Sequence, residues 1–107
     1  MPNKKESIRS KGRLKFNEVR SGDFLEEYEG NSLKLRGFFF VIRGHRSKGF
    51  EPECWECIRW SILKEDVDYD KHYLNKSDFQ YRGYRIARHM PVGSREKMQF
   101  QAFNESL

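Results

Sequence analysis

The chain has little apolar material and no long hydrophobic run. Of its 107 residues, 36% are hydrophobic, and no segment approaches the roughly 18 consecutive apolar residues of a membrane-spanning helix. The N-terminal sequence MPNKKESIRSKGRLK also lacks the apolar stretch that forms the core of a signal peptide. We therefore expect no membrane partner and a location in the cytoplasm or the nucleus.

Cysteine is scarce, with Cys54 and Cys57 the only two in the chain. Without export features they are expected to stay reduced rather than to form a disulfide. Their Cys-x-x-Cys spacing suits two zinc-binding thiolates, but residues three apart on a regular strand point to opposite faces. The histidines His45, His72 and His89 are not spaced as the nitrogen pair of a common zinc finger. The sequence therefore predicts no cofactor and no metal site, with a zinc ion at the two cysteines as the open alternative.

Motifs for catalysis are also missing. The sequence contains no nucleophile motif, no phosphate-binding glycine loop and no acid and base at a persuasive spacing. The acidic run from Asp66 to Asp70 invites a calcium interpretation, which fails because Lys71 stands where the loop needs glycine and Ser77 where it needs glutamate. We predict a protein that is not an enzyme; a small ribonuclease built from the three histidines is the alternative, and nothing in the sequence brings them together.

What the chain does contain is aromatic residues and positive charge. Aromatic residues make up 15% of the sequence and supply large buried areas for a short polar chain. The formal net charge is +5, and it is uneven: residues 1–50 hold 12 Lys and Arg against 6 Asp and Glu, whereas residues 51–107 hold 9 against 10. A basic first half suits an anionic partner such as nucleic acid.

The hydrophobic pattern predicts one mainly β domain over residues 14–107, preceded by a flexible basic arm at residues 1–13. Two runs rich in β-forming residues, Phe38–Ile42 and Trp55–Leu63, are expected to pair as an antiparallel hairpin with a long cationic tip. We predict a small antiparallel sheet or an SH3-like barrel of four to five strands. The segment from Ser94 favours a short C-terminal helix, although its alternation also fits a strand.

The two tryptophans are expected to differ in burial. Trp60 shares its strand face with Ile58 and Ile62, which predicts a core position. Trp55 shares the other face with Cys57 and Arg59, which predicts a more mixed surface.

Gly37-Phe38-Phe39-Phe40, followed after a basic loop by Trp55-Glu56-Cys57, resembles the front half of a FLYWCH-type zinc finger. The resemblance implies a small antiparallel sheet that serves DNA binding or protein interaction, with Cys57 at the first cysteine position of the family. The other ligands of the family, a second cysteine shortly downstream and a terminal H-x-H pair, do not occur in this sequence.

Basic and aromatic side chains give a broader signal for function. One group is expected at the hairpin tip and the other along a strand from Tyr81 to Met90; the candidate residues are Arg43, His45, Arg46, Lys48, Tyr81, Arg82, Arg85 and Arg88. Guanidinium groups hold phosphates, and exposed tyrosines stack on bases. We predict a nucleic-acid-binding module, with a small protein-interaction module as the alternative. A third interpretation makes Phe79, Tyr81 and Tyr84 part of the core.

Overall fold

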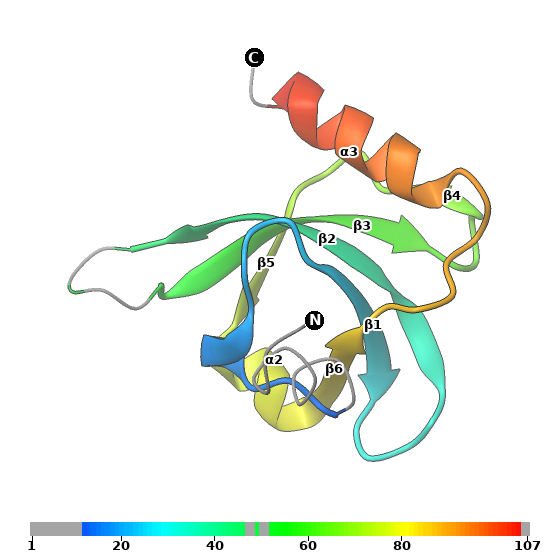
Figure 1. Cartoon of the computed structure of the whole chain (residues 1–107). Helices are drawn as coiled ribbons and strands as arrows, with labels where there is room; N and C mark the ends of the chain where they lie inside the picture. The colour runs from blue at the N-terminus through cyan, green and yellow to red at the C-terminus, as the bar shows by residue number, and fades with distance from the viewer. Residues whose placement is uncertain (1–11, 47–48, 50–51, 106–107) are drawn as a thin grey trace, which may run out of the picture.

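The computed structural model describes residues 12–46, 49 and 52–105. Its elements follow one another as the short 3-10 helix η1 (Phe16–Glu18), β1 (Phe24–Glu29), β2 (Leu35–His45), β3 (Cys54–Ser61), β4 (Asp66–Val67), β5 (His72–Asn75), α2 (Lys76–Tyr81), β6 (Arg82–Ile86) and α3 (Ser94–Glu105). Figure 1 shows the sheet between two helices, with α3 above it and α2 below it.

The six strands form one antiparallel sheet in the order β4-β3-β2-β1-β6, and β5 pairs with β3 as well. β4 and β5 occupy successive stretches of the same edge of β3, at Trp60–Ser61 and at Cys54–Cys57. No ladder joins β6 to β4 or β5 in the part of the chain that is described, so the sheet is open. The predicted mainly β, antiparallel fold with a C-terminal helix is confirmed, and of the two predicted forms the structure has the open sheet, with one strand more than expected.

Alternation along the strands divides the core between the two faces of the sheet. On β2, Phe39 and Val41 point to the face that carries α2, and Phe38 points to the face that carries α3, as a period of two requires. The core of the α2 face contains Leu14, Phe16, Val19, Leu25, Phe39, Val41, Trp55, Cys57, Leu74 and Tyr84. The core of the α3 face contains Phe38, Ile58, Trp60, Val67, Ala87, Met98 and Ala102.

Two bulges in β2 break this alternation and decide where its arginines lie. Between the pairs Glu27↔Gly37 and Tyr28↔Leu35, β2 has one residue more than β1, which is Arg36. The extra residue turns Arg36 onto the α2 face, where it meets Glu27. The second bulge, just before Arg43, turns that arginine onto the α3 face.

Both tryptophans are buried, with 7% of Trp55 and 6% of Trp60 exposed. They lie on opposite faces as predicted, but the mixed surface expected around Trp55 is wrong. The indole Nε1 of Trp55 donates a hydrogen bond to the carbonyl oxygen of Phe16 at 3.1 Å, and the ring centroids of Trp55 and Phe16 are 6.2 Å apart. The segment around η1 therefore covers a strand face that was expected to be partly open.

The N-terminal segment is joined to the sheet from Arg13 onward. The Arg13 guanidinium donates to the side-chain oxygen of Asn31 and to the carbonyl oxygen of Arg82, each at 3.0 Å, and the Leu14 amide donates to the carbonyl of Tyr84 at 2.7 Å. The rest of the predicted arm, residues 1–11, lies outside the described residues. Across the described part of the chain, no helix has the length and apolar character needed to cross a membrane.

Candidate nucleic-acid interface

One polar cluster lies on the α3 face where β2 and β3 extend toward their connecting turn. At its centre is the carboxylate of Glu56, which is 3% exposed. His45 contacts Glu56 Oε1 through Nε2 at 2.6 Å, while Lys71 Nζ and Arg43 Nε approach Oε2 at 3.5 and 3.8 Å. Burying a carboxylate is costly unless cations and hydrogen bonds compensate for its lost hydration. The buried Glu56 therefore fixes three cationic or ionisable side chains while their outer surfaces stay in solvent.

The outer parts of this cluster are accessible. The side chains of Arg43 and His45 are 52% and 46% exposed, and Tyr73, whose ring packs edge-on against His45, is 53% exposed. Arg46 follows the end of β2 and is also exposed. We call Arg43, His45, Arg46, Lys71 and Tyr73 the hairpin surface.

Close packing on the opposite face supports the base of this hairpin. A side chain at Gly44 would place its Cβ 2.8 Å from Pro52 and 3.0 Å from Trp55, so only glycine permits this contact. The backbone ladder continues past the strand ends, because the Glu53 amide donates to the His45 carbonyl at 2.7 Å. The hairpin surface therefore rests on well-packed backbone.

Because Glu56 is ionised in the folded protein, we expect the stability of the fold to depend on pH. Burial by itself would raise the pKa of Glu56, but the hydrogen bond from His45 and the charges of Lys71 and Arg43 outweigh it and hold the pKa below its usual value. A depressed pKa gives stability that is fully present above the unfolded-state pKa of about 4.3 and is lost as the pH falls through the folded-state pKa. The denaturant midpoint of the wild-type protein should therefore fall with decreasing pH in the acid range. The midpoint of the Glu56→Gln variant should fall less steeply.

Asp66 and Asp68 remain in Glu56→Gln and also have lowered pKa values. The Asp66 carboxylate accepts a hydrogen bond from the Val67 amide, and Lys64 and Arg59 outweigh the burial of Asp68. The acid loss should therefore shrink without disappearing. Identical acid slopes for the wild-type protein and the variant would contradict the role assigned to Glu56.

A second buried glutamate organises the α2 face at the other end of the sheet. Glu27 is 1% exposed and accepts a hydrogen bond from the Tyr84 hydroxyl at 2.5 Å. Its two oxygens also face Arg36 Nε and Arg82 Nη1, each at 3.6 Å. Burial raises the pKa of Tyr84 and the hydrogen bond to Glu27 acts in the same direction, so the hydroxyl remains a donor.

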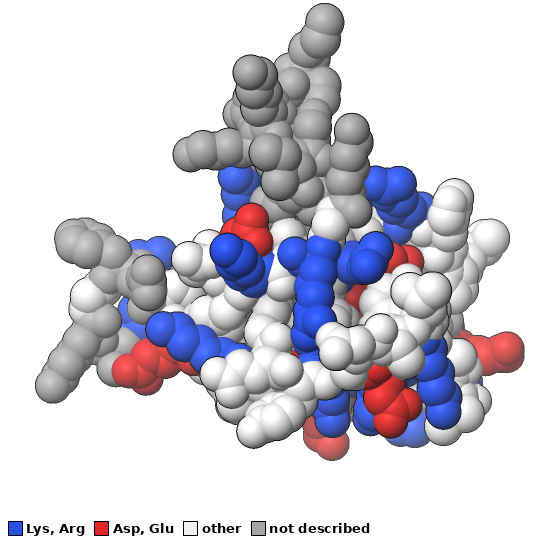
Figure 2. All heavy atoms as spheres, turned by 90° about the horizontal axis from the view of Figure 1, so that it is seen from below, with Lys and Arg blue, Asp and Glu red and all other residues white. Residues whose placement is uncertain are grey.

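This second cluster continues across the neighbouring strands. Arg59 donates to the Arg36 carbonyl at 3.0 Å and pairs with Asp68 at 3.4 Å. Gly37 makes room for it, because a Cβ there would lie 3.0 Å from the Arg59 guanidinium. Lys64 meets the other oxygen of Asp68 at 3.0 Å. We call Arg13, Arg36, Arg59, Lys64 and Arg82 the arginine row; Figure 2, from the α2 side, shows blue side chains across this face with red ones between them.

The residues predicted from sequence do not share one surface. Arg43, His45 and Arg46 lie on the hairpin surface, and Lys48 lies outside the described residues. The other candidates separate: Arg82 belongs to the arginine row, Arg85 lies over Tyr28 on the α3 face, Arg88 is exposed after β6, and Tyr81 is 74% exposed at the end of α2.

Four residues that organise these surfaces were missed: Glu27, Arg36, Glu56 and Lys71. The available signal was the position of Glu27 and Glu56 inside runs that otherwise read as strands, since a charged residue in a buried strand needs a partner. Which cations pair with these two glutamates depends on the strand register and on the two bulges, and neither can be read from the sequence.

Of the three rings that one interpretation placed in the core, Tyr84 is fully buried and Phe79 is partly buried. They stack with their centroids 4.3 Å apart. Tyr81 is mostly exposed, so that interpretation is wrong for this ring.

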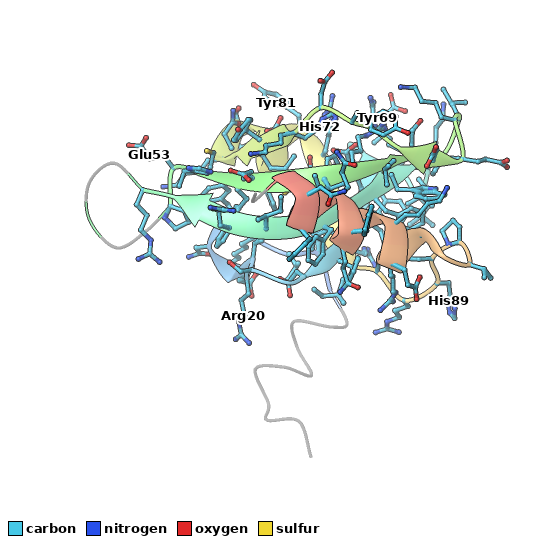
Figure 3. All side chains as sticks on the ribbon, turned by 90° about the horizontal axis from the view of Figure 1, so that it is seen from above. Arg20, Glu53, Tyr69, His72, Tyr81 and His89 are labelled. Carbon is cyan, nitrogen blue, oxygen red and sulfur yellow. The ribbon has the colours of Figure 1, made fainter. Side chains whose placement is uncertain are left out.

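The two cysteines lie on opposite faces of the sheet, and each is level with one histidine of a neighbouring strand, Cys54 with His45 and Cys57 with His72. Cys57 is fully buried on the α2 face, where burial raises the pKa of its thiol, and Cys54 is half-buried at the start of β3. No three His, Cys, Asp or Glu side chains of the described ranges are grouped as metal ligands. His72 packs against Phe39 on the α2 face, and Figure 3 shows His72 and His89 on opposite edges of the molecule.

Exposed aromatic side chains also lie beside α3, away from both polar clusters. Tyr69 is 72% exposed and Phe100 is 67% exposed, and with Val67 they line a shallow groove of about 460 Å³. Charged side chains of both signs, Asp66, Glu96 and Lys97, border the groove.

The chain matches no protein-family model, and no curated protein and no solved structure is significantly similar to it. The resemblance to the FLYWCH family therefore stays a prediction.

Proposed function

We propose that this protein is a nucleic-acid-binding module that contacts backbone phosphates through the hairpin surface. The observation that carries the proposal is the convergence of Arg43, His45 and Lys71 on the buried carboxylate of Glu56. One negative charge is enclosed within the cluster, while the cationic groups around it remain partly open to solvent. Side chains that are already ordered lose less conformational entropy when they bind a ligand.

The side chains of the hairpin surface suit both parts of a nucleotide. Guanidinium and ammonium groups bind phosphate oxygens, and each phosphate that they neutralise releases a counterion. The ring of Tyr73 is half exposed beside His45 and offers a face on which a base can stack. The contacts are to backbone and ring faces, so we propose binding with little dependence on sequence.

The proposed activity is binding without catalysis. His45 is held by Glu56 on the α3 face, whereas His72 lies on the α2 face beside Phe39. General acid–base catalysis requires an acid and a base within reach of one substrate, and these two imidazoles lie on opposite sides of the sheet. This separation supports a binding module over the ribonuclease alternative.

Arg46→Ala tests the hairpin surface. Arg46 is exposed at the end of β2, so its removal should leave the fold intact and weaken binding to duplex DNA at every sequence. The slope of log K against log salt concentration should fall by about one unit, because one fewer counterion is released. Anisotropy titrations at several salt concentrations measure both quantities.

Arg85→Ala is the matched control, because Arg85 is an exposed arginine that lies over Tyr28 at the other end of the sheet. It removes the same charge and should leave the affinity and the slope closer to those of the wild-type protein. Equal losses in the two variants would mean that only net charge matters and would contradict the assigned surface.

The groove beside α3 favours a second candidate function, binding to another protein. Exposed aromatic side chains such as Tyr69 and Phe100 are frequent anchors of protein interfaces. An interface anchored by aromatic rings weakens much less with salt than phosphate contacts do. Salt dependence therefore separates the two functions.

A further inference from the structure

The arginine row is a second open cationic surface that the hairpin surface does not use. Its five cations exceed the four carboxylates among them: Arg13, Arg36, Arg59, Lys64 and Arg82 lie around Glu27, Glu29, Asp68 and Asp78. Lys64 is 70% exposed, Arg82 39% and Arg36 37%. Two carboxylates orient most of the row: the buried Glu27 faces Arg36 and Arg82, and Asp68 pairs with Arg59 and Lys64.

The two surfaces point in opposite directions. Each face of the sheet has one half covered by a helix and one half that is polar, and the polar halves lie at opposite ends: Glu56 and its partners on the α3 face, Glu27 and its partners on the α2 face. The strand register gives the distance between the two surfaces along the sheet. Gly83, next to Arg82, and Leu35 both pair with Tyr28, so they are level with each other. Leu35 lies eight residues before Arg43, which is about 26 Å along an extended strand.

We propose that the arginine row binds the phosphate backbone of a second nucleic-acid segment, so that one protein molecule bridges two segments. The inference rests on the proposed function. A straight duplex cannot lie against both faces of a sheet, so contacts at the two surfaces require two segments or one that folds back. The row offers guanidinium groups from β6, β2 and β3, which is the geometry of a surface contact with several phosphates.

A bridging assay tests the proposal. One short DNA duplex is immobilised, and a second, fluorescent duplex of the same sequence is added with the full chain at low salt. The wild-type protein should retain the fluorescent duplex. The row variant Arg82→Ala with Lys64→Ala and the hairpin variant Arg43→Ala with Arg46→Ala should each bind the immobilised duplex and reduce the retained fluorescence by at least about tenfold. Arg85→Ala, which removes a cation from neither surface, should retain it fully.

Two further measurements separate the outcomes. Lys64→Glu, at a residue that is 70% exposed, repeats the test without touching the core if the double row variant does not fold. A mixture of the two single-surface variants should not restore bridging, because each molecule then has one working surface. Restored bridging would mean that protein self-association joins the duplexes, and it would overturn the inference.

The control for the proposed function is the first binding step. If the wild-type protein binds the immobilised duplex but retains no second one, the hairpin surface stands and the bridging inference is wrong. If it binds neither duplex at low salt, both proposals are wrong.

Discussion

Alanine at Trp55 and alanine at Trp60 should each lower the free energy of unfolding by about 3–5 kcal/mol, the usual cost of removing a buried aromatic ring. The two rings belong to separate halves of the core, since Trp55 packs with Phe16 and Leu74 on the α2 face and Trp60 packs on the α3 face. Trp55→Ala also leaves the Phe16 carbonyl without the indole donor that it has at 3.1 Å. Denaturant unfolding of the two single variants measures both losses.

Tyr73→Ala is the matched control, because this aromatic side chain is 53% exposed on the neighbouring strand β5. Its loss should be much smaller, as expected for a surface substitution. A large loss for Trp60→Ala with a small one for Trp55→Ala would contradict the packing of the N-terminal segment over the α2 face.

Glu27→Ala should destabilise the protein by about 1–3 kcal/mol, because it leaves the buried Tyr84 hydroxyl without an acceptor. The loss of the ion pair with Arg82 should add little, since Arg82 is more than a third exposed and solvent screens it. Glu27→Gln keeps an acceptor oxygen and should recover part of the loss. Thermal or denaturant unfolding of both variants gives the comparison.

Tyr84→Phe identifies the source of that loss. If the hydroxyl carries most of the effect, Glu27→Ala should cost much less in a Tyr84→Phe background than alone, because neighbours that share one hydrogen bond are not additive. Fully additive losses would show that Glu27 acts through its arginine partners instead.

Most of the fold was predictable because strand alternation and helix periodicity are local signals. The aromatic run of β2 and the run of β3 pair as expected, with Phe38 opposite Trp60 and Phe40 opposite Ile58. The helix expected from Ser94 is present, and Met98 and Ala102 are buried on one side of it, four residues apart.

The parts of the fold that were missed depend on long-range packing. β5 has four residues and lies in a segment for which the sequence predicts no strand, and its pairing with β3 makes it one. The closure of the α2 face by Leu14, Phe16 and Val19 is also a contact across the chain, which no local pattern encodes.

The candidate site was predictable only in part, because its arrangement also depends on contacts between distant parts of the chain. The basic residues of the hairpin were identified from their position between two strands. The separation of Arg43 and His45 from Arg82 depends on the bulge before Arg43, which turns the following part of β2 to the α3 face. Such a shift leaves no trace in composition.

The most direct test of the central claim is to map the chemical-shift changes of the backbone amides when duplex DNA is added at low salt. The hairpin surface predicts the largest changes from Arg43 to Arg46, at and just after the end of β2, and from Lys71 to Tyr73, at the start of β5. Added salt should reverse these changes. Changes confined to the groove of Tyr69 and Phe100, or no changes at any DNA concentration, would contradict it.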